Sequence, residues 1–342
     1  MKILLYADPH LSMSSSLVKY VGASGFTARL DNLIESFEWM RTNFDYCDMV
    51  FCLGDFTDRS DLNATEITAM SKLGAEDHHF IVGNHCRSNV SGSINTLSMF
   101  KNVYYKPTYM DLDGKKVLIL PYRSDNYDLS EYDKVDIILS HNDISGVRYG
   151  GYVNHTGFEI SDILDKCDLF INGHIHSGGY VVKDKIVNLG QLTGVNFSSC
   201  GGEWEPSVGV LDTDSMSLEI IQNPFAIKYK KVEFDNVLDC KSYLDGLIRN
   251  RYVLQVKVPN KIAEEVRSMI SCCPFVVGSR IIVIPDELSA YERIKERESE
   301  IITVPSMYRQ LKEFLKSLST DDYPDIVRII NEIEEGNCES EV

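Results

Sequence analysis

Five short apolar runs, each followed by polar residues, constrain the fold of this chain more than any other feature. Their apolar residues are continuous rather than alternating, the pattern of central strands covered on both faces. The runs are Lys2–Ala7, Met49–Leu53, Phe80–Val82, Asp136–Ser140 and Leu169–Asn172. Between the first two runs, residues 28–43 have one apolar helical face, formed by Leu30, Leu33, Ile34, Phe37 and Met40. This strand–helix–strand order predicts an α/β layered sheet.

The residues that follow these runs are mostly histidines, aspartates and an asparagine: Asp8, His10, Asp55, Asn84, His85, His141, His174 and His176. In open α/β sheets, ligands bind where the strands end. A single Asp or His at a strand end is usually a turn residue. Several of them, each after a buried strand, predict a site for a divalent ion such as Mn²⁺, Fe²⁺ or Zn²⁺. Cys86 is the one cysteine among these motifs, which argues against a structural zinc site.

The order of these motifs resembles that of the calcineurin-like metallophosphoesterase superfamily. The motifs that carry the resemblance lie within residues 1–220, and they are Asp8-Pro9-His10, Gly54-Asp55-Phe56-Thr57-Asp58-Arg59, Gly83-Asn84-His85, His141 and Gly173-His174-Ile175-His176. The resemblance implies a layered β-sandwich flanked by helices. It also implies two divalent ions, with Mn²⁺ favoured. One would be held by Asp8, His10, Asp55 and His176, and the other by Asp55, Asn84, His141 and His174.

By this resemblance, a hydroxide activated by the two ions attacks phosphorus. His85 would assist as a catalytic residue that does not bind metal. Asp58 and Arg59 would support the ligands by hydrogen bonds. The family usually has an acid directly after Gly-Asn-His, where this chain has Cys86. Because a thiol is a poor acceptor, His85 is expected to be less basic, or oriented by another acid such as Asp58 or Asp143.

The rest of the chain predicts further units. Residues 1–224 form the expected metallophosphoesterase domain, and 225–285 read as a small α+β cap domain. Residues 228–284 read as strand, helix, strand, helix, strand, with strands at 252–258 and 280–284 and a helix at 262–270. Residues 286–304 read as a charged linker. Residues 305–336 read as a pair of helices with two apolar stripes, made of Met307, Leu311, Phe314, Leu315, Leu318, Ile326, Ile329, Ile330 and Ile333. These stripes suit docking on a partner's helices, or packing against their own domain.

This order of units resembles the meiotic-recombination-eleven/SbcD nuclease family, and the length is close to that of short phage-type members. The resemblance implies a DNA exonuclease or endonuclease that is a subunit of an SbcCD-type DNA repair and recombination complex. The expected partners are DNA, an SMC-like coiled-coil ATPase of the SbcC type and a second copy of the chain. The alternatives are a stand-alone phosphodiesterase or phosphatase on nucleotides or small phosphoesters, and a scaffold with a decayed site.

Composition limits these alternatives. The net charge of −17 opposes unaided binding to a phosphate backbone, so a nuclease of this kind needs a partner that supplies basic surface. No apolar run approaches the roughly 20 residues of a membrane-spanning helix, so we expect no membrane association. The N-terminus lacks a signal-peptide pattern. The nine cysteines are irregularly spaced, as in reduced proteins, which favours the cytoplasm.

Overall fold

The computed structural model describes residues 1–284, apart from 14–20, 22–23, 150–151, 198–202 and 248–250. The chain divides into two units, residues 1–284 and 285–342. The predicted linker at 286–304 and the helical pair at 305–336 therefore lie outside the described residues.

Two six-stranded sheets stack face to face in the first unit. The first sheet has the order β14-β13-β1-β2-β3-β4, with bounds Ser217–Gln222, Ser207–Asp212, Lys2–Tyr6, Met49–Cys52, His79–Ile81 and Asn102–Tyr104. The second has the order β11-β12-β10-β7-β6-β5, with bounds Gly179–Val182, Ile186–Asn188, Cys167–Asn172, Val135–Ser140, Lys115–Leu120 and Thr108–Leu112. Apolar side chains from both sheets fill the space between them, among them Leu5, Phe51, Ile119, Ile137 and Ile171.

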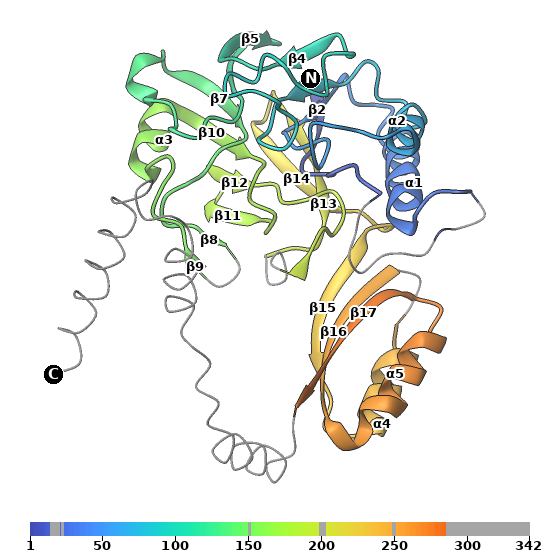
Figure 1. The fold of residues 1–342 in the computed structure, drawn as a ribbon. Helices are drawn as coiled ribbons and strands as arrows, with labels where there is room; N and C mark the ends of the chain where they lie inside the picture. The colour runs from blue at the N-terminus through green and yellow to red at the C-terminus, as the bar shows by residue number, and fades with distance from the viewer. Residues whose placement is uncertain (14–20, 22–23, 150–151, 198–202, 248–250, 285–342) are drawn as a thin grey trace, which may run out of the picture. The chain divides into compact units, whose positions relative to one another are not determined.

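Helices cover the two outer faces, as Figure 1 shows. Helices α1 (Ala28–Asn43) and α2 (Ala64–Met70) pack on the first sheet. Helix α3 (Ile160–Lys166) and the short helix η1 (Leu129–Glu131) pack on the second. Helix α1 begins where Thr27 Oγ1 accepts the Leu30 amide, a standard N-cap. The predicted layered α/β sandwich flanked by helices is confirmed.

The strand ends carry the motifs, as predicted. Strands β1, β2, β3 and β4 run parallel in the first sheet, and β6, β7, β10 and β12 run parallel in the second. The carboxyl ends of parallel strands meet at one edge of their sheet. The loops after β1, β2, β3, β7 and β10 hold all the predicted metal ligands.

A smaller module, here called the cap module (residues 227–284), follows the sandwich. Its elements are β15 (Ile227–Glu233), α4 (Val237–Asp245), β16 (Arg251–Pro259), η3 (Asn260–Ile262), α5 (Ala263–Cys272) and β17 (Val276–Ile284). The expected order of strands and helices is present. All three strands pair in parallel, so the module is a βαβαβ unit rather than the α+β arrangement we expected. Figure 1 shows α4 and α5 on the same face of this sheet.

Two further short strands, β8 (Arg148–Tyr149) and β9 (Tyr152–Val153), form a separate hairpin. Among the described residues, the helices are too short or too polar to cross a membrane.

Candidate metal centre

The structure brings the seven predicted ligands together at the strand ends. Asp8, His10 and His176 form one group, and Asp55, His141 and His174 form another, each with its ligand atoms within 4.8 Å of one another. Asn84 joins the second group, because its Oδ1 lies 3.3 Å from His141 Nε2.

Asp55 lies between the two groups. Its Oδ2 is 3.8 Å from His10 Nε2 in the first group and 3.2 Å from His141 Nε2 in the second. Its side chain is 2% exposed, so solvent cannot replace either contact. This position is the one that the predicted bridging ligand requires.

The backbone at the site is held in an uncommon conformation. Asp8, His10, Asp55 and His174 have φ angles of 51°, 44°, 44° and 68°, in the left-handed region that residues with a Cβ avoid. Amide hydrogen bonds hold two of these turns, from Asp8 N to the Gly54 carbonyl (3.2 Å) and from His10 N to the Asp55 carbonyl (3.0 Å). Backbone strain of this kind clusters at functional sites, where it aims side chains inward.

Glycines in the motifs make room for the ligands. A Cβ on Gly83 would lie 2.2 Å from Asp55 Oδ1, and one on Gly54 would lie 1.9 Å from His141 Nδ1. A residue with a side chain at either position would displace a candidate ligand.

Oxygen atoms hold the far nitrogens of three candidate histidine ligands. His141 Nδ1 donates to the Leu53 carbonyl (2.7 Å), so its Nε2 lone pair faces Asp55. His10 Nδ1 lies 3.2 Å from Asp58 Oδ1, and His174 Nε2 lies 3.4 Å from Asp143 Oδ1. Such partners fix the tautomer and the direction of a metal-binding imidazole. Asp58 is therefore placed to orient the candidate ligand His10.

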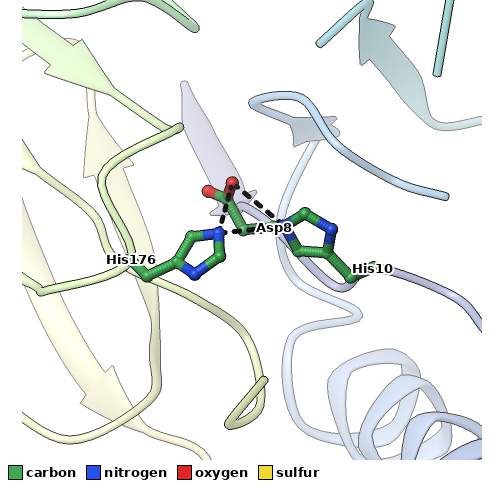
Figure 2. Close-up of side chains that lie close together, drawn as sticks. All are labelled: Asp8, His10 and His176. Carbon is green, nitrogen blue, oxygen red and sulfur yellow. Dashed lines mark hydrogen bonds and ion pairs between the residues drawn. The ribbon is translucent and has the colours of Figure 1, made fainter. Parts of the chain in front are cut away.

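The residues of the first group fit a cation. Asp8 Oδ1 is buried and has no hydrogen-bond partner among the described residues. It lies 3.7 Å from His10 Nε2 and 3.6 Å from His176 Nε2, and the two nitrogens are 2.9 Å apart (Figure 2). A lone buried carboxylate oxygen and two converging imidazoles are costly without a positive charge between them. Oxygen and nitrogen donors of these kinds suit a divalent transition ion.

The charges of the site depend strongly on one another. Burial opposes ionisation of Asp55, but the charge of His141 and its hydrogen bond hold the carboxyl pKa well below its usual range. Burial also opposes the charge on His10, but the neighbouring carboxylates of Asp58 and Asp8 raise its pKa to about 9. Burial and the neighbouring His10 lower the pKa of His176 to about 4. His10 is therefore the more basic of the two facing imidazoles.

His85 lies at the rim of the site and is more exposed than the candidate ligands. Its backbone amide donates to Asp55 Oδ1 (2.9 Å), and its Nδ1 donates to the Asp58 backbone carbonyl (2.7 Å). The ring packs edge-on against His10, with centroids 4.8 Å apart. The Asp58 carbonyl thus supplies the orientation that we expected an acid to supply.

Two expectations about this histidine need correction. Cys86 is fully buried in the core under the first sheet, with its Sγ 3.5 Å from Thr57 Oγ1, and burial raises its thiol pKa to about 11. It is a neutral core residue. Asp143 contacts His174, not His85.

Arg59 supports the loop after His10. It pairs with the buried Glu66 carboxylate and donates to Ser12 Oγ (3.1 Å). Glu66 also accepts the Met13 amide (2.8 Å). Our sequence analysis missed Glu66, whose capping-box position after Asn63 was the available signal.

Arg29 is a second residue that the sequence analysis missed. Its buried guanidinium donates to the carbonyls of Pro9 (2.8 Å), His10 (3.0 Å) and Gly194 (2.8 Å). These hydrogen bonds connect the loop after β1 to the loop after β12. The available signal was a charged residue one turn before Leu33, on the apolar face of α1.

A cavity of about 490 Å³, here called the His176 cavity, opens beside the site. His176 and Trp204 line it from the sandwich, and Tyr229, Lys230 and Lys231 line it from β15 of the cap module. Residues of both parts of the first unit therefore share this space.

The fold and the candidate ligand set together define a metal-dependent hydrolase with a site for two ions. The chain belongs to the calcineurin-like phosphoesterase family, whose model matches residues 1–178. This family uses a dinuclear metal centre.

Two solved structures are similar to this chain. A purple acid phosphatase from yellow lupin (Lupinus luteus) seeds is 14% identical, with a TM-score of 0.43, and the match covers 65% of this chain and 51% of that one. This chain thus spans about half of that phosphatase. A protein of unknown function from Aquifex aeolicus is 17% identical, with a TM-score of 0.29, and the match covers 51% of this chain and 79% of that one. The comparison with curated proteins gave no match.

Proposed function

We propose that this phosphoesterase is a metal-dependent DNA nuclease, the SbcD-type subunit of a DNA repair and recombination complex. The observation that supports this best is the His176 cavity, because a second module contributes Tyr229, Lys230 and Lys231 to the space beside a candidate metal ligand. A hydrolase of small phosphate esters needs no second module. A substrate that extends away from the scissile bond would contact such a second module.

The candidate ligands would divide between two ions. Asp8, His10 and His176 would hold the first, Asn84, His141 and His174 would hold the second, and Asp55 would bind both. Two bound divalent ions, Mn²⁺ in our proposal, would supply a nucleophile at neutral pH and neutralise charge on the phosphate.

His85 would move a proton. Its Nδ1 donates to the Asp58 carbonyl, so its Nε2 is the nitrogen left for substrate. At the exposed rim, this nitrogen would deliver a proton to the leaving oxygen. The hydrogen bond that the His85 backbone amide donates to Asp55 Oδ1 keeps this residue beside the shared carboxylate.

The net charge of −17 makes a partner part of the proposal. Such a chain gains little from phosphate contacts alone. An SMC-like ATPase that docks on the helices predicted at 305–336 would supply the basic surface, and a second copy of the chain would complete the assembly.

One comparison of substrates tests the activity. The purified full-length chain is assayed with Mn²⁺, Mg²⁺ or Zn²⁺ on single-stranded DNA, duplex DNA, methyl p-nitrophenyl phosphate and p-nitrophenyl phosphate. We expect metal-dependent cleavage of DNA and of the diester, with DNA preferred. Cleavage of the small esters with no cleavage of DNA would favour the stand-alone phosphoesterase.

A truncation tests the partner. Deleting residues 305–342 should spare metal-dependent cleavage of short single-stranded DNA. It should abolish co-purification with an SMC-like ATPase and any ATP-stimulated cleavage of duplex DNA. Leu311→Asp with Ile330→Asp is the matched variant with less disturbance. Aggregation or loss of basal activity in both would show that these residues belong to the catalytic fold.

A further inference from the structure

The His176 cavity is built from closely packed backbone. Its volume of about 490 Å³ lies in the range of sites for small molecules, about 300–1,000 Å³. Gly178 follows His176 by two residues, and a Cβ there would lie 2.1 Å from Trp204 Nε1. Gly190 has a φ of 76°, and a Cβ there would lie 2.8 Å from Gly178 Cα. These glycines let the Trp204 indole approach the Gly-His-Ile-His motif.

The indole of Trp204 is fixed in place. Its Nε1 donates to the Leu189 carbonyl (3.2 Å), and its ring packs edge-on against Tyr180, with centroids 5.4 Å apart. The residue is half-buried, so part of the ring remains available to the cavity. A fixed aromatic ring beside a phosphodiester site suits stacking of a nucleobase, and such stacking tolerates any base.

The charges in the cavity do not suit a continuing phosphate chain. Protein grooves that bind the backbone of single-stranded nucleic acid are positively charged. Here Glu205 pairs with Lys230, and a second carboxylate, Glu203, accepts the Tyr180 amide (2.8 Å). With Lys231 included, the carboxylates and the lysines of the lining balance. A neutral ligand with an aromatic face fits this space better than a second phosphate.

We propose that the His176 cavity is a subsite for the terminal nucleoside of a DNA strand, stacked on Trp204. The inference rests on the proposed nuclease function and deepens it. A terminal nucleoside seated here would place the adjacent phosphodiester beside His176. Cleavage would then release mononucleotides from a strand end rather than longer fragments.

Fluorescence tests binding without metal or turnover. The chain has two tryptophans. Trp39 lies in α1, outside the cavity, and packs on Phe44. In Trp39→Phe, Trp204 is the remaining reporter, and titration with deoxyadenosine should quench its emission. Trp204→Phe should show no such quenching, and inorganic phosphate should have no effect on either variant. Equal quenching of both variants, or quenching of neither, would overturn the subsite.

A substrate pair tests the same ring during turnover. The p-nitrophenyl ester of thymidine 5′-phosphate is compared with methyl p-nitrophenyl phosphate, which has a methyl group in place of the nucleoside. Trp204→Leu should lower the ratio of their kcat/KM values by about 10-fold, a change within the measured range for base–aromatic stacking. Trp204→Phe should keep most of the ratio, which controls for folding. An unchanged ratio in Trp204→Leu would contradict the proposal.

The two proposals fail separately. Quenching by deoxyadenosine with no cleavage of DNA would refute the nuclease and leave the nucleoside subsite standing. Cleavage of DNA with neither quenching nor a change in the ratio would refute the subsite alone.

Discussion

Histidines shielded wholly or partly from solvent occupy two regions of this molecule, and the difference between them shows what marks a candidate ligand. His78 is half-buried beside the apolar core under the first sheet, where its ring stacks on Phe37 and contacts the Tyr6 hydroxyl (3.1 Å). His141 in the metal centre is fully buried, and its two nitrogens face a carbonyl and a carboxylate. Burial alone therefore does not define a ligand. A candidate ligand is an imidazole with one nitrogen hydrogen-bonded to an oxygen atom and the other directed at a carboxylate.

The largest effect should come from the residue between the two ligand groups. Asp55→Ala should abolish hydrolysis, by about a thousandfold or more, equivalent to about 4 kcal/mol. It should also abolish metal uptake, because both groups lose a ligand. Turnover and metal content per chain are the measurements, with the exposed Asp168→Ala as the matched control. Full metal content in Asp55→Ala would show that this carboxylate is not shared.

The core histidine should give a clear pH effect. Burial lowers the pKa of His78 to about 4, below the value near 6.5 of an unfolded histidine. The unfolded chain therefore binds more protons between these values, and the stability contributed by neutral His78 is lost as the pH falls from about 6.5 to about 4.

This pH effect is measured as the free energy of unfolding in urea. The loss through His78 should reach about 3 kcal/mol at most. His78→Phe should flatten the dependence over this window. The same slope in the variant and in the parent would show that other groups cause it.

Asp8→Asn should destabilise the protein more with metal than without it. In the metal-free protein, the change removes a carboxylate whose pKa, despite burial, the neighbouring His10 and His141 hold below its usual value, so the fold should lose stability. With Mn²⁺ present, the loss should be larger, because the first ion also loses a carboxylate ligand. Urea midpoints with chelator and with Mn²⁺ measure the two losses. Equal losses under both conditions would mean that Asp8 does not bind metal.

The smallest effect should come from Cys86, which lies in the core although its motif belongs to the site. Cys86→Ala should leave turnover within about twofold, because the Asp58 carbonyl already holds the His85 ring. Cys86→Asp should destabilise the protein rather than raise turnover, since it buries a charge in an apolar cluster. A faster Cys86→Asp enzyme with a shifted pH profile would restore the expectation from the sequence.

The sequence predicted those parts of the site that depend on strand ends. Asp8, Asp55 and His141 each follow a continuous apolar run, and such runs become buried parallel strands whose ends meet. Pairing between loops was not predictable. Asp143 lies two residues after His141 and was a candidate partner for His85. However, β7 pairs with β10 in the second sheet, so its loop faces His174, whereas His85 follows β3 in the first sheet.

The left-handed turns at Asp8 and His10 also left no signal, because nothing in those residue types requires a positive φ. The cap module shows a similar limit. Its alternation of strands and helices could be predicted, but its parallel register was not.

The most direct test of the account separates catalysis from metal binding at His85. His85 lies near His10 and Asp58 in a third group of possible ligand atoms, but its Nδ1 is taken up by the Asp58 carbonyl, so we expect it to transfer a proton and not to bind an ion. His85→Ala should lose hydrolysis while the purified protein still binds two Mn²⁺ per chain, measured by elemental analysis and calorimetry. An inactive His85→Ala protein with one ion or none would contradict the account, because His85 would then be a ligand.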